Sequence, residues 1–150
     1  MKVVILAGGF GTRLSEYTDS IPKPMVPIGG LPMIHHIINI YASYGHKEFY
    51  IALGYKGDVI KKYFKNKIDG LTINLIDTGS ETLTGGRVKR LEKYLKNEKF
   101  LLTYGDGLSN INIRELISFH ERHKKIVTMS AVRPPARFGA LMLKDDKIIK

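Results

Sequence analysis

Five apolar residues, Val3 to Ala7, are followed at once by Gly8 and Gly9. A short, continuous apolar run that ends in glycines is typical of a strand buried on both faces, as the strands of a parallel sheet are. Parallel strands need crossover connections, which are usually helices. This segment therefore predicts an α/β protein with a mostly parallel sheet, in which a helix follows the glycine loop.

Predicted strands and helices alternate along the rest of the chain. Apolar residues recur with the helical period between Pro32 and Tyr44, and Gly45 is placed to end that helix. The other expected elements are strands over 48–53, 71–76, 100–104 and 126–132, helices over 59–65 and 112–123, and a hairpin over 140–150. Such alternation predicts right-handed crossovers between the strands of one sheet.

The length and residue usage of the chain limit its class. A chain of 150 residues corresponds to about one domain, so residues 1–150 are expected to fold as a single unit. No stretch approaches the roughly 18 consecutive apolar residues that a membrane helix needs. The absence of cysteine excludes a disulfide framework, a cysteine-ligated zinc site and a thiol nucleophile. These features predict a cytoplasmic protein without a membrane partner.

The net charge of the chain is +10, from 24 Lys and Arg against 14 Asp and Glu. Such an excess favours anionic partners, which include nucleic acids, membrane surfaces and phosphorylated small molecules. Much of it lies in residues 55–67 and 87–99, which are typical of solvated helix faces and lack aromatic residues spaced for base stacking. A nucleic-acid-binding function therefore rests on the charge alone, and no nucleic-acid partner is expected.

Ligands of open parallel sheets bind beyond the carboxyl ends of the strands, and three loops occupy such positions. The loops cover residues 8–13, 77–87 and 105–107. In the first loop, glycines allow backbone N–H groups to approach a phosphate. This loop lacks the order of a Walker P-loop, and Leu14 stands where a dinucleotide fingerprint has its third glycine. A standard P-loop NTPase and an NAD enzyme are therefore disfavoured.

Charged residues strengthen the phosphate interpretation of these loops. Arg13 offers a rigid fork for phosphate oxygens, and Lys23 is held between two prolines. Asp106 follows a predicted buried strand, where a carboxylate can hold Mg²⁺ against substrate phosphates. Taken singly, each has an ordinary alternative: a surface arginine, a solvated lysine and a turn aspartate.

These segments resemble the sugar-phosphate nucleotidyltransferases, also called nucleotide-sugar pyrophosphorylases. LAGGFGTRL followed by KPMVPIGGLPMI is similar to the signature of that family. Its glucose-1-phosphate cytidylyltransferase branch is similar in the segments ALGYKGDVIKKYF, DTGSETLTGGRVKRL, LLTYGDGLSNINI and AVRPPARFGAL. The resemblance covers essentially the whole chain.

The resemblance implies a Rossmann-like, three-layer fold of the nucleotide-diphospho-sugar transferase type. Residues 1–150 would form the N-terminal, nucleotide-binding portion of its catalytic domain. The implied reaction transfers CMP from CTP to a phosphorylated acceptor such as glucose 1-phosphate. An oxygen of the acceptor phosphate would attack the α-phosphorus of CTP in line, and pyrophosphate would leave. The resemblance also implies Mg²⁺ as cofactor, a homo-oligomer and a role in polysaccharide biosynthesis.

The same resemblance implies a role for each site residue. As catalytic residues, Arg13 would stabilise the triphosphate, Lys23 would bridge the α-phosphate and the acceptor phosphate, and Asp106 would bind Mg²⁺. Arg87 can donate to the O2 and N3 acceptors of cytosine. The nucleotide-binding residues would be Leu6, Ala7, Gly8, Gly9, Gly11, Thr12, Arg13, Gly85, Gly86, Arg87 and Gly105, and the acceptor-binding residues would be Lys23, Tyr104 and Gly139, next to Phe138.

Two departures from the family pattern leave alternatives open. The segment 65–76 is shorter than in the glucose-1-phosphate enzymes, so the acceptor could be another sugar 1-phosphate or a compound such as phosphoglutamine. The chain ends at Lys150, before a lysine-bearing segment and a second metal-binding aspartate of the family pattern. A non-catalytic nucleotide-binding fragment is therefore the second hypothesis.

Overall fold

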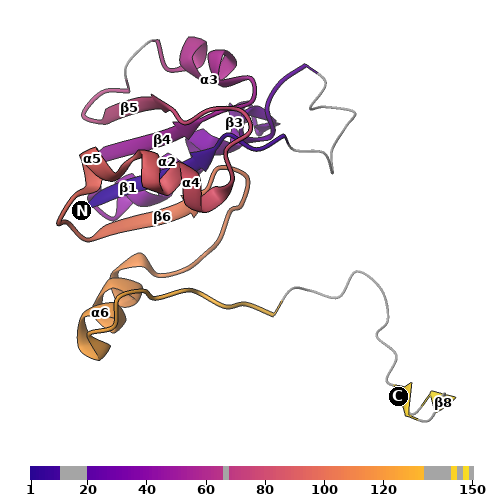
Figure 1. Cartoon of the computed structure of the whole chain (residues 1–150), viewed down its shortest axis with the longest axis vertical. Helices are drawn as coiled ribbons and strands as arrows, with labels where there is room; N and C mark the ends of the chain where they lie inside the picture. Colours follow the sequence, from indigo (N-terminus) through magenta and orange to yellow (C-terminus); the bar gives the residue numbers. More distant parts are fainter. Residues whose placement is uncertain (11–19, 66–67, 134–142, 145–146, 149–150) are drawn as a thin grey trace. The chain divides into compact units, whose positions relative to one another are not determined.

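The computed structural model describes residues 1–10, 20–65, 68–133, 143–144 and 147–148 (Figure 1). The chain divides into two compact units, Met1–Arg114 and Glu115–Lys150. The first unit contains the parallel sheet, and the second contains most of one helix and a short hairpin. All described residues of the candidate site belong to the first unit.

Four parallel strands form the sheet of the first unit, in the order β5-β4-β1-β6. Their bounds are Lys2–Ala7 for β1, Glu48–Leu53 for β4, Thr72–Asp77 for β5 and Phe100–Tyr104 for β6. The register aligns Ala7 with Leu53 and Leu53 with Asp77, so these strands end at one edge. The chain has β4 on one side of β1 and β6 on the other, and open parallel sheets bind ligands at such a reversal of strand order.

Helices cover both faces of this sheet, which gives the three layers that the resemblance implied (Figure 1). The helices are α2 (Met33–Ser43), α3 (Gly57–Tyr63), α4 (Thr84–Arg90) and α5 (Glu92–Leu95). Alternate residues of the strands belong to two cores because successive side chains point to opposite faces. Ile5 and Ile51 pack in the core that contains residues of α2 and α3, whereas Val4 and Ala52 pack with Leu91 on the other face.

A short segment brings Lys23 to the end of the sheet. It consists of the 3₁₀ turn η2 (Lys23–Met25) and a small antiparallel pair, β2 (Pro27–Ile28) with β3 (Leu31–Pro32). Met25 is buried in the main core and its N–H donates to the Pro22 carbonyl at 2.8 Å. This packing fixes the backbone on both sides of Lys23.

Most of the predicted elements are confirmed. The helix predicted between residues 32 and 44 is α2, and Gly45 follows it with a φ of +87°, a conformation that favours glycine. The helix predicted over 112–123 is α6 (Ile113–His123). Within the hairpin predicted over 140–150, the described residues form β7 (Leu143–Lys144) and β8 (Lys147–Ile148), which pair antiparallel.

The strand predicted over 126–132 is wrong for this structure. These residues form neither helix nor strand, and Ile126 and Met129 are almost fully exposed. The β-branched composition of the segment suits a strand, but a strand is stable only when a neighbour completes its backbone hydrogen bonds. Among the described residues of the second unit, no strand pairs with this segment.

The described part of the chain contains no helix with the length and apolar content needed to cross a bilayer.

His46 is buried just after the C-terminal end of α2, and its protonation should affect stability. Burial lowers the pKa of the His46 ring, and the charge of the N-terminus acts in the same direction. At acidic pH the unfolded chain therefore binds a proton at His46 more readily than the folded state does. The free energy of unfolding should then fall as the pH drops below about 6.5. Urea denaturation at pH 7.5 and pH 5.5 measures this loss. In the His46→Gln variant the loss should be smaller, and an equal loss would contradict the assignment.

Candidate active site

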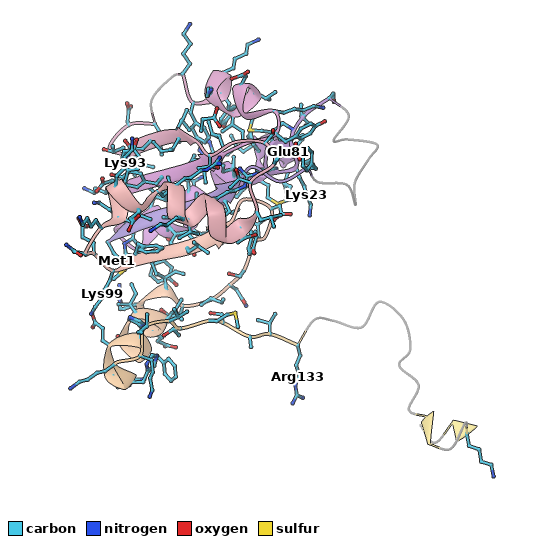
Figure 2. All side chains as sticks on the ribbon, in the orientation of Figure 1. Met1, Lys23, Glu81, Lys93, Lys99 and Arg133 are labelled. Atoms are coloured by element: carbon cyan, nitrogen blue, oxygen red, sulfur yellow. The ribbon has the colours of Figure 1, made fainter. Side chains whose placement is uncertain are left out.

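A cavity of about 660 Å³ opens at the carboxyl ends of β1 and β6. Its walls come from four segments: the end of β1 with the loop after it, the η2 turn, the loop between β5 and α4, and the loop after β6. The lining residues are Leu6, Ala7, Gly8, Gly9, Phe10, Lys23, Pro24, Ser80, Glu81, Thr82, Leu83, Thr84, Arg87, Tyr104, Asp106 and Gly107. Figure 2 shows Lys23 and Glu81 at one end of the sheet and Met1 and Lys99 at the other.

Lys23 and Asp106 form an ion pair at this cavity. The Lys23 Nζ lies 2.6 Å from Asp106 Oδ2, and both side chains are partly exposed. The pair joins segments 83 residues apart in sequence, and each partner also lines the cavity. A cation and a carboxylate therefore meet at the reversal point of the sheet, where both can face a ligand.

Gly105 allows Asp106 to take this position. Its N–H donates to the Leu6 carbonyl at 2.9 Å, which extends the pairing of β6 with β1 by one residue. A Cβ at position 105 would lie 3.1 Å from that carbonyl oxygen and 3.1 Å from Pro24 Cγ. A larger residue would thus require the β6 loop, β1 or Pro24 to shift by a few tenths of an ångström.

The loop between β5 and α4 is held by its own backbone and by Arg90. Thr78 is fully buried, and both its N–H and its hydroxyl donate to the Leu53 carbonyl. Arg90 donates to the Thr78 carbonyl and to Thr82 Oγ1, and the Gly79 N–H donates to Asp77 Oδ1. The cavity residues of this loop are therefore carried on an ordered backbone.

Arg87 is the most buried charged residue of the site, with 4% of its surface exposed. Its Nη1 donates to Leu53 O at 3.0 Å, Thr78 Oγ1 at 2.8 Å and Gly79 O at 2.7 Å, and its Nη2 donates to Gly8 O at 2.8 Å and Ser80 O at 3.0 Å. Burial lowers the pKa of the guanidinium, the charge of Arg90 acts in the same direction, and Asp77 opposes both. A role in reading cytosine stays a prediction, and it would require Arg87 to exchange some of these bonds.

The structure brings together many of the expected site residues and leaves some apart. Those that line the cavity are Leu6, Ala7, Gly8, Gly9, Lys23, Arg87, Tyr104 and Asp106. Gly85, Gly86 and Gly105 lie next to lining residues without being part of the lining. Gly11, Thr12, Arg13, Phe138 and Gly139 lie outside the described residues, so their assignments stay predictions.

Several cavity residues were missed from the sequence. They are Phe10, Pro24, Ser80, Glu81, Thr82, Leu83, Thr84 and Gly107. The sequence predicts the loop over residues 77–87 at this edge of the sheet, but within it only Gly85, Gly86 and Arg87 are predicted to bind the nucleotide. The signal that could have identified Ser80 to Thr84 is their place between the end of a strand and the glycine pair at 85 and 86.

Comparison with known proteins identifies the family. The sequence matches the Nucleotidyl transferase family over residues 2–150. The chain belongs to this family. The glucose-1-phosphate cytidylyltransferase of Salmonella typhimurium is 44% identical over 171 aligned residues, which cover 99% of this chain and 66% of that protein. The resemblance stated from the motifs is therefore confirmed.

Two further relatives support this family membership. The D-glycero-α-D-manno-heptose 1-phosphate guanylyltransferase of Aneurinibacillus thermoaerophilus is 30% identical over 152 aligned residues, which cover 99% of this chain and 66% of that protein. The crystal structure of HddC from Yersinia pseudotuberculosis, complexed with GMP-PN, matches with a TM-score of 0.69 and 32% identity over 79% of this chain and 53% of that one. The expected nucleotide-diphospho-sugar transferase fold is thus confirmed. The chain spans 66% of the length of each of the two curated relatives named above.

Asp106 is the cavity carboxylate that is predicted to bind a metal ion. Among the residues described, no group of three or more His, Asp or Glu side chains is placed to hold a metal ion. Mg²⁺ commonly takes one or two carboxylates together with waters and substrate phosphates. Asp106, the one carboxylate predicted as a ligand, is compatible with this mode of binding, in which a phosphorylated substrate would complete the coordination.

Proposed function

We propose that the protein transfers CMP from CTP to a phosphorylated acceptor, with glucose 1-phosphate as the first candidate, and releases pyrophosphate. The observation that carries the proposal is the Lys23–Asp106 ion pair in the lining of a cavity that Gly8 and Gly9 also line. The 44% identity to a glucose-1-phosphate cytidylyltransferase supports the choice of substrates. Residues 1–150 would then belong to the catalytic domain of such an enzyme.

The proposed reaction is an in-line displacement at phosphorus. An oxygen of the acceptor phosphate forms a bond to the α-phosphorus of CTP, and the bond from that phosphorus to the bridging oxygen of pyrophosphate breaks. The attacking oxygen is already ionised, so no base has to remove a proton. Catalysis then depends on positioning and on neutralising the negative charge of two phosphorylated substrates.

Each site residue has a place in this proposal. Lys23 would sit between the α-phosphate and the acceptor phosphate, where its charge offsets their repulsion. The glycine loop would offer N–H groups to the triphosphate, to which Arg13 would also donate. Mg²⁺, when bound by Asp106 and the phosphates, would supply further charge neutralisation. Gly85 and Gly86 would recognise the base, and Tyr104 and Gly139 the acceptor.

The acceptor is the part of the proposal with a specific alternative. The match to the cytidylyltransferase extends over 171 aligned residues although this chain has 150, so that relative has positions that this chain lacks. The match to the heptose 1-phosphate guanylyltransferase covers the same share of the chain over 152 aligned residues. This difference in length favours a test of other sugar 1-phosphates, of phosphoglutamine and of GTP.

Homo-oligomerisation, a cytoplasmic location and a role in polysaccharide biosynthesis also belong to the proposal.

A pyrophosphate-release screen tests the proposed function. The chain is incubated with Mg²⁺, each of the four common nucleoside triphosphates and each candidate acceptor, including glucose 1-phosphate and phosphoglutamine. We expect release with CTP that depends on the acceptor. Release with GTP instead would move the protein to the guanylyltransferases. Calorimetric binding of CTP without turnover of any acceptor would support the second hypothesis, a non-catalytic nucleotide-binding module.

A further inference from the structure

The buried side chain of Arg87 joins the ends of three parallel strands. It donates to the Gly8 carbonyl just after β1, to the Leu53 carbonyl at the end of β4, and to three oxygens of residues 78–80 after β5. Four of these five acceptors are backbone carbonyls, so the side chain holds the backbone in place where the three strands end. Removing the guanidinium would take this donor from the Gly79 and Ser80 carbonyls. The Leu53 and Gly8 carbonyls would each keep a backbone N–H donor.

Two glycines make room for the guanidinium. A Cβ at Gly8 would overlap the Arg87 guanidinium. A Cβ at Gly54 would lie 2.5 Å from Arg87 Nη1 and 2.7 Å from the Gly8 carbonyl oxygen. Gly54 is not part of the cavity lining, unlike Gly8. The sequence thus holds two glycines at the points where side chains would displace Arg87.

The bond from Arg87 to Gly8 fixes the orientation of one peptide group of the phosphate-binding loop. The Gly8 carbonyl accepts from Arg87 Nη2 at 2.8 Å and from the Tyr55 N–H at 3.2 Å. A trans peptide group is planar, with its N–H directed opposite to its C=O. Holding the Gly8 carbonyl therefore also holds the Gly9 N–H in one direction, and Gly9 lines the cavity.

We propose that Arg87 is a positioning residue of the phosphate site: it holds the Gly8 carbonyl so that the Gly9 N–H is presented to an anion in the cavity. The inference rests on the proposed function, because it assumes that the cavity takes a polyphosphate. Backbone N–H groups fixed in this way form the anion-binding concavities of many phosphate sites. Arg87 thus contributes to phosphate affinity without touching the phosphate.

An arginine is required for this role. Its planar group presents donors in fixed directions, so that one side chain can serve the ends of three strands at once. A lysine would keep the positive charge but has one nitrogen, which cannot reach oxygens on both sides of the site. The Arg87→Lys variant therefore separates charge from geometry.

The experiment compares two probes that differ in whether they carry a base. Calorimetry measures the affinity of the full chain for CTP and for inorganic tripolyphosphate, in the wild type and in the Arg87→Lys and Gly54→Ala variants. Positioning of the phosphate loop predicts that both variants lose affinity for both probes by a similar factor, about tenfold or more. The matched control is Arg114→Lys, at an exposed arginine of the same unit, which should bind both probes as the wild type does.

The other outcomes are decisive. A loss for CTP alone would assign Arg87 to base recognition and overturn the inference, as would unchanged affinity for both probes. If the wild type binds neither probe, the proposed function itself fails. Thermal melting shows whether the variants are folded at the assay temperature. A measurement on the wild type needs no variant: the ¹⁵N-labelled Gly9 amide should shift on titration with tripolyphosphate, and an unmoved resonance would overturn the inference.

Discussion

The Asp106→Asn variant is expected to release pyrophosphate roughly 10² to 10⁴ times more slowly than the wild type. Asparagine keeps the shape of the side chain but removes the charge that pairs with Lys23 at 2.6 Å. It also weakens the oxygen ligand that we propose for Mg²⁺. The measurement is a coupled pyrophosphate assay at saturating CTP and acceptor, repeated over a range of Mg²⁺ concentrations.

The Mg²⁺ series separates the two causes. If Asp106 binds the metal, the variant should need a higher Mg²⁺ concentration for half of its maximal rate. If Asp106 acts only by holding Lys23, the maximal rate should fall without a shift in Mg²⁺ dependence. The control is Asp58→Asn, since Asp58 is a largely exposed carboxylate that pairs with Lys61 on α3, away from the cavity lining. A rate within about threefold of the wild type for Asp106→Asn would contradict both roles.

The sheet could be predicted from sequence because its signal is local. The apolar run from Val3 to Ala7 and the strand over residues 48–53 are buried almost throughout, so nearly every residue in them is apolar. The order of the strands in the sheet depends on which distant segments pair. No local sequence pattern predicts that order. The segment over residues 126–132 shows the opposite case, since its strand-like composition is not accompanied by a pairing strand among the described residues.

The candidate site was predictable in its residues but not in their partners. The sequence predicts Lys23 near phosphates because it lies between two prolines, and Asp106 because it follows a buried strand. Their direct ion pair was not expected, because it joins residues 83 positions apart through the register of β1 with β6. The family resemblance predicts Arg87 at the base. Its bonds to the ends of three strands depend on the folded positions of Gly8, Leu53 and residues 78–80.

The Phe49→Ala variant should lose about 3 to 5 kcal/mol of unfolding free energy. Phe49 is fully buried in β4 and belongs to the core that also contains residues of α2 and α3. The substitution removes the buried contacts of the ring. It also leaves a cavity that the close-packed core around it cannot fill. Urea denaturation followed by circular dichroism measures the change.

This loss should be separable from function, because Phe49 lies toward the amino end of β4, paired with Val3 and Ile73, whereas the cavity lies at the carboxyl edge. At a temperature where the variant is folded, its affinity for CTP should therefore stay close to that of the wild type. The matched control is Phe119→Ala, since that ring is 53% exposed and its removal should cost less than about 1 kcal/mol. A Phe49→Ala loss as small as the control's would contradict the assignment of Phe49 to the core. Weaker CTP binding by the folded variant would instead show that the core under α2 and α3 also sets the geometry of the cavity at the carboxyl edge of the sheet.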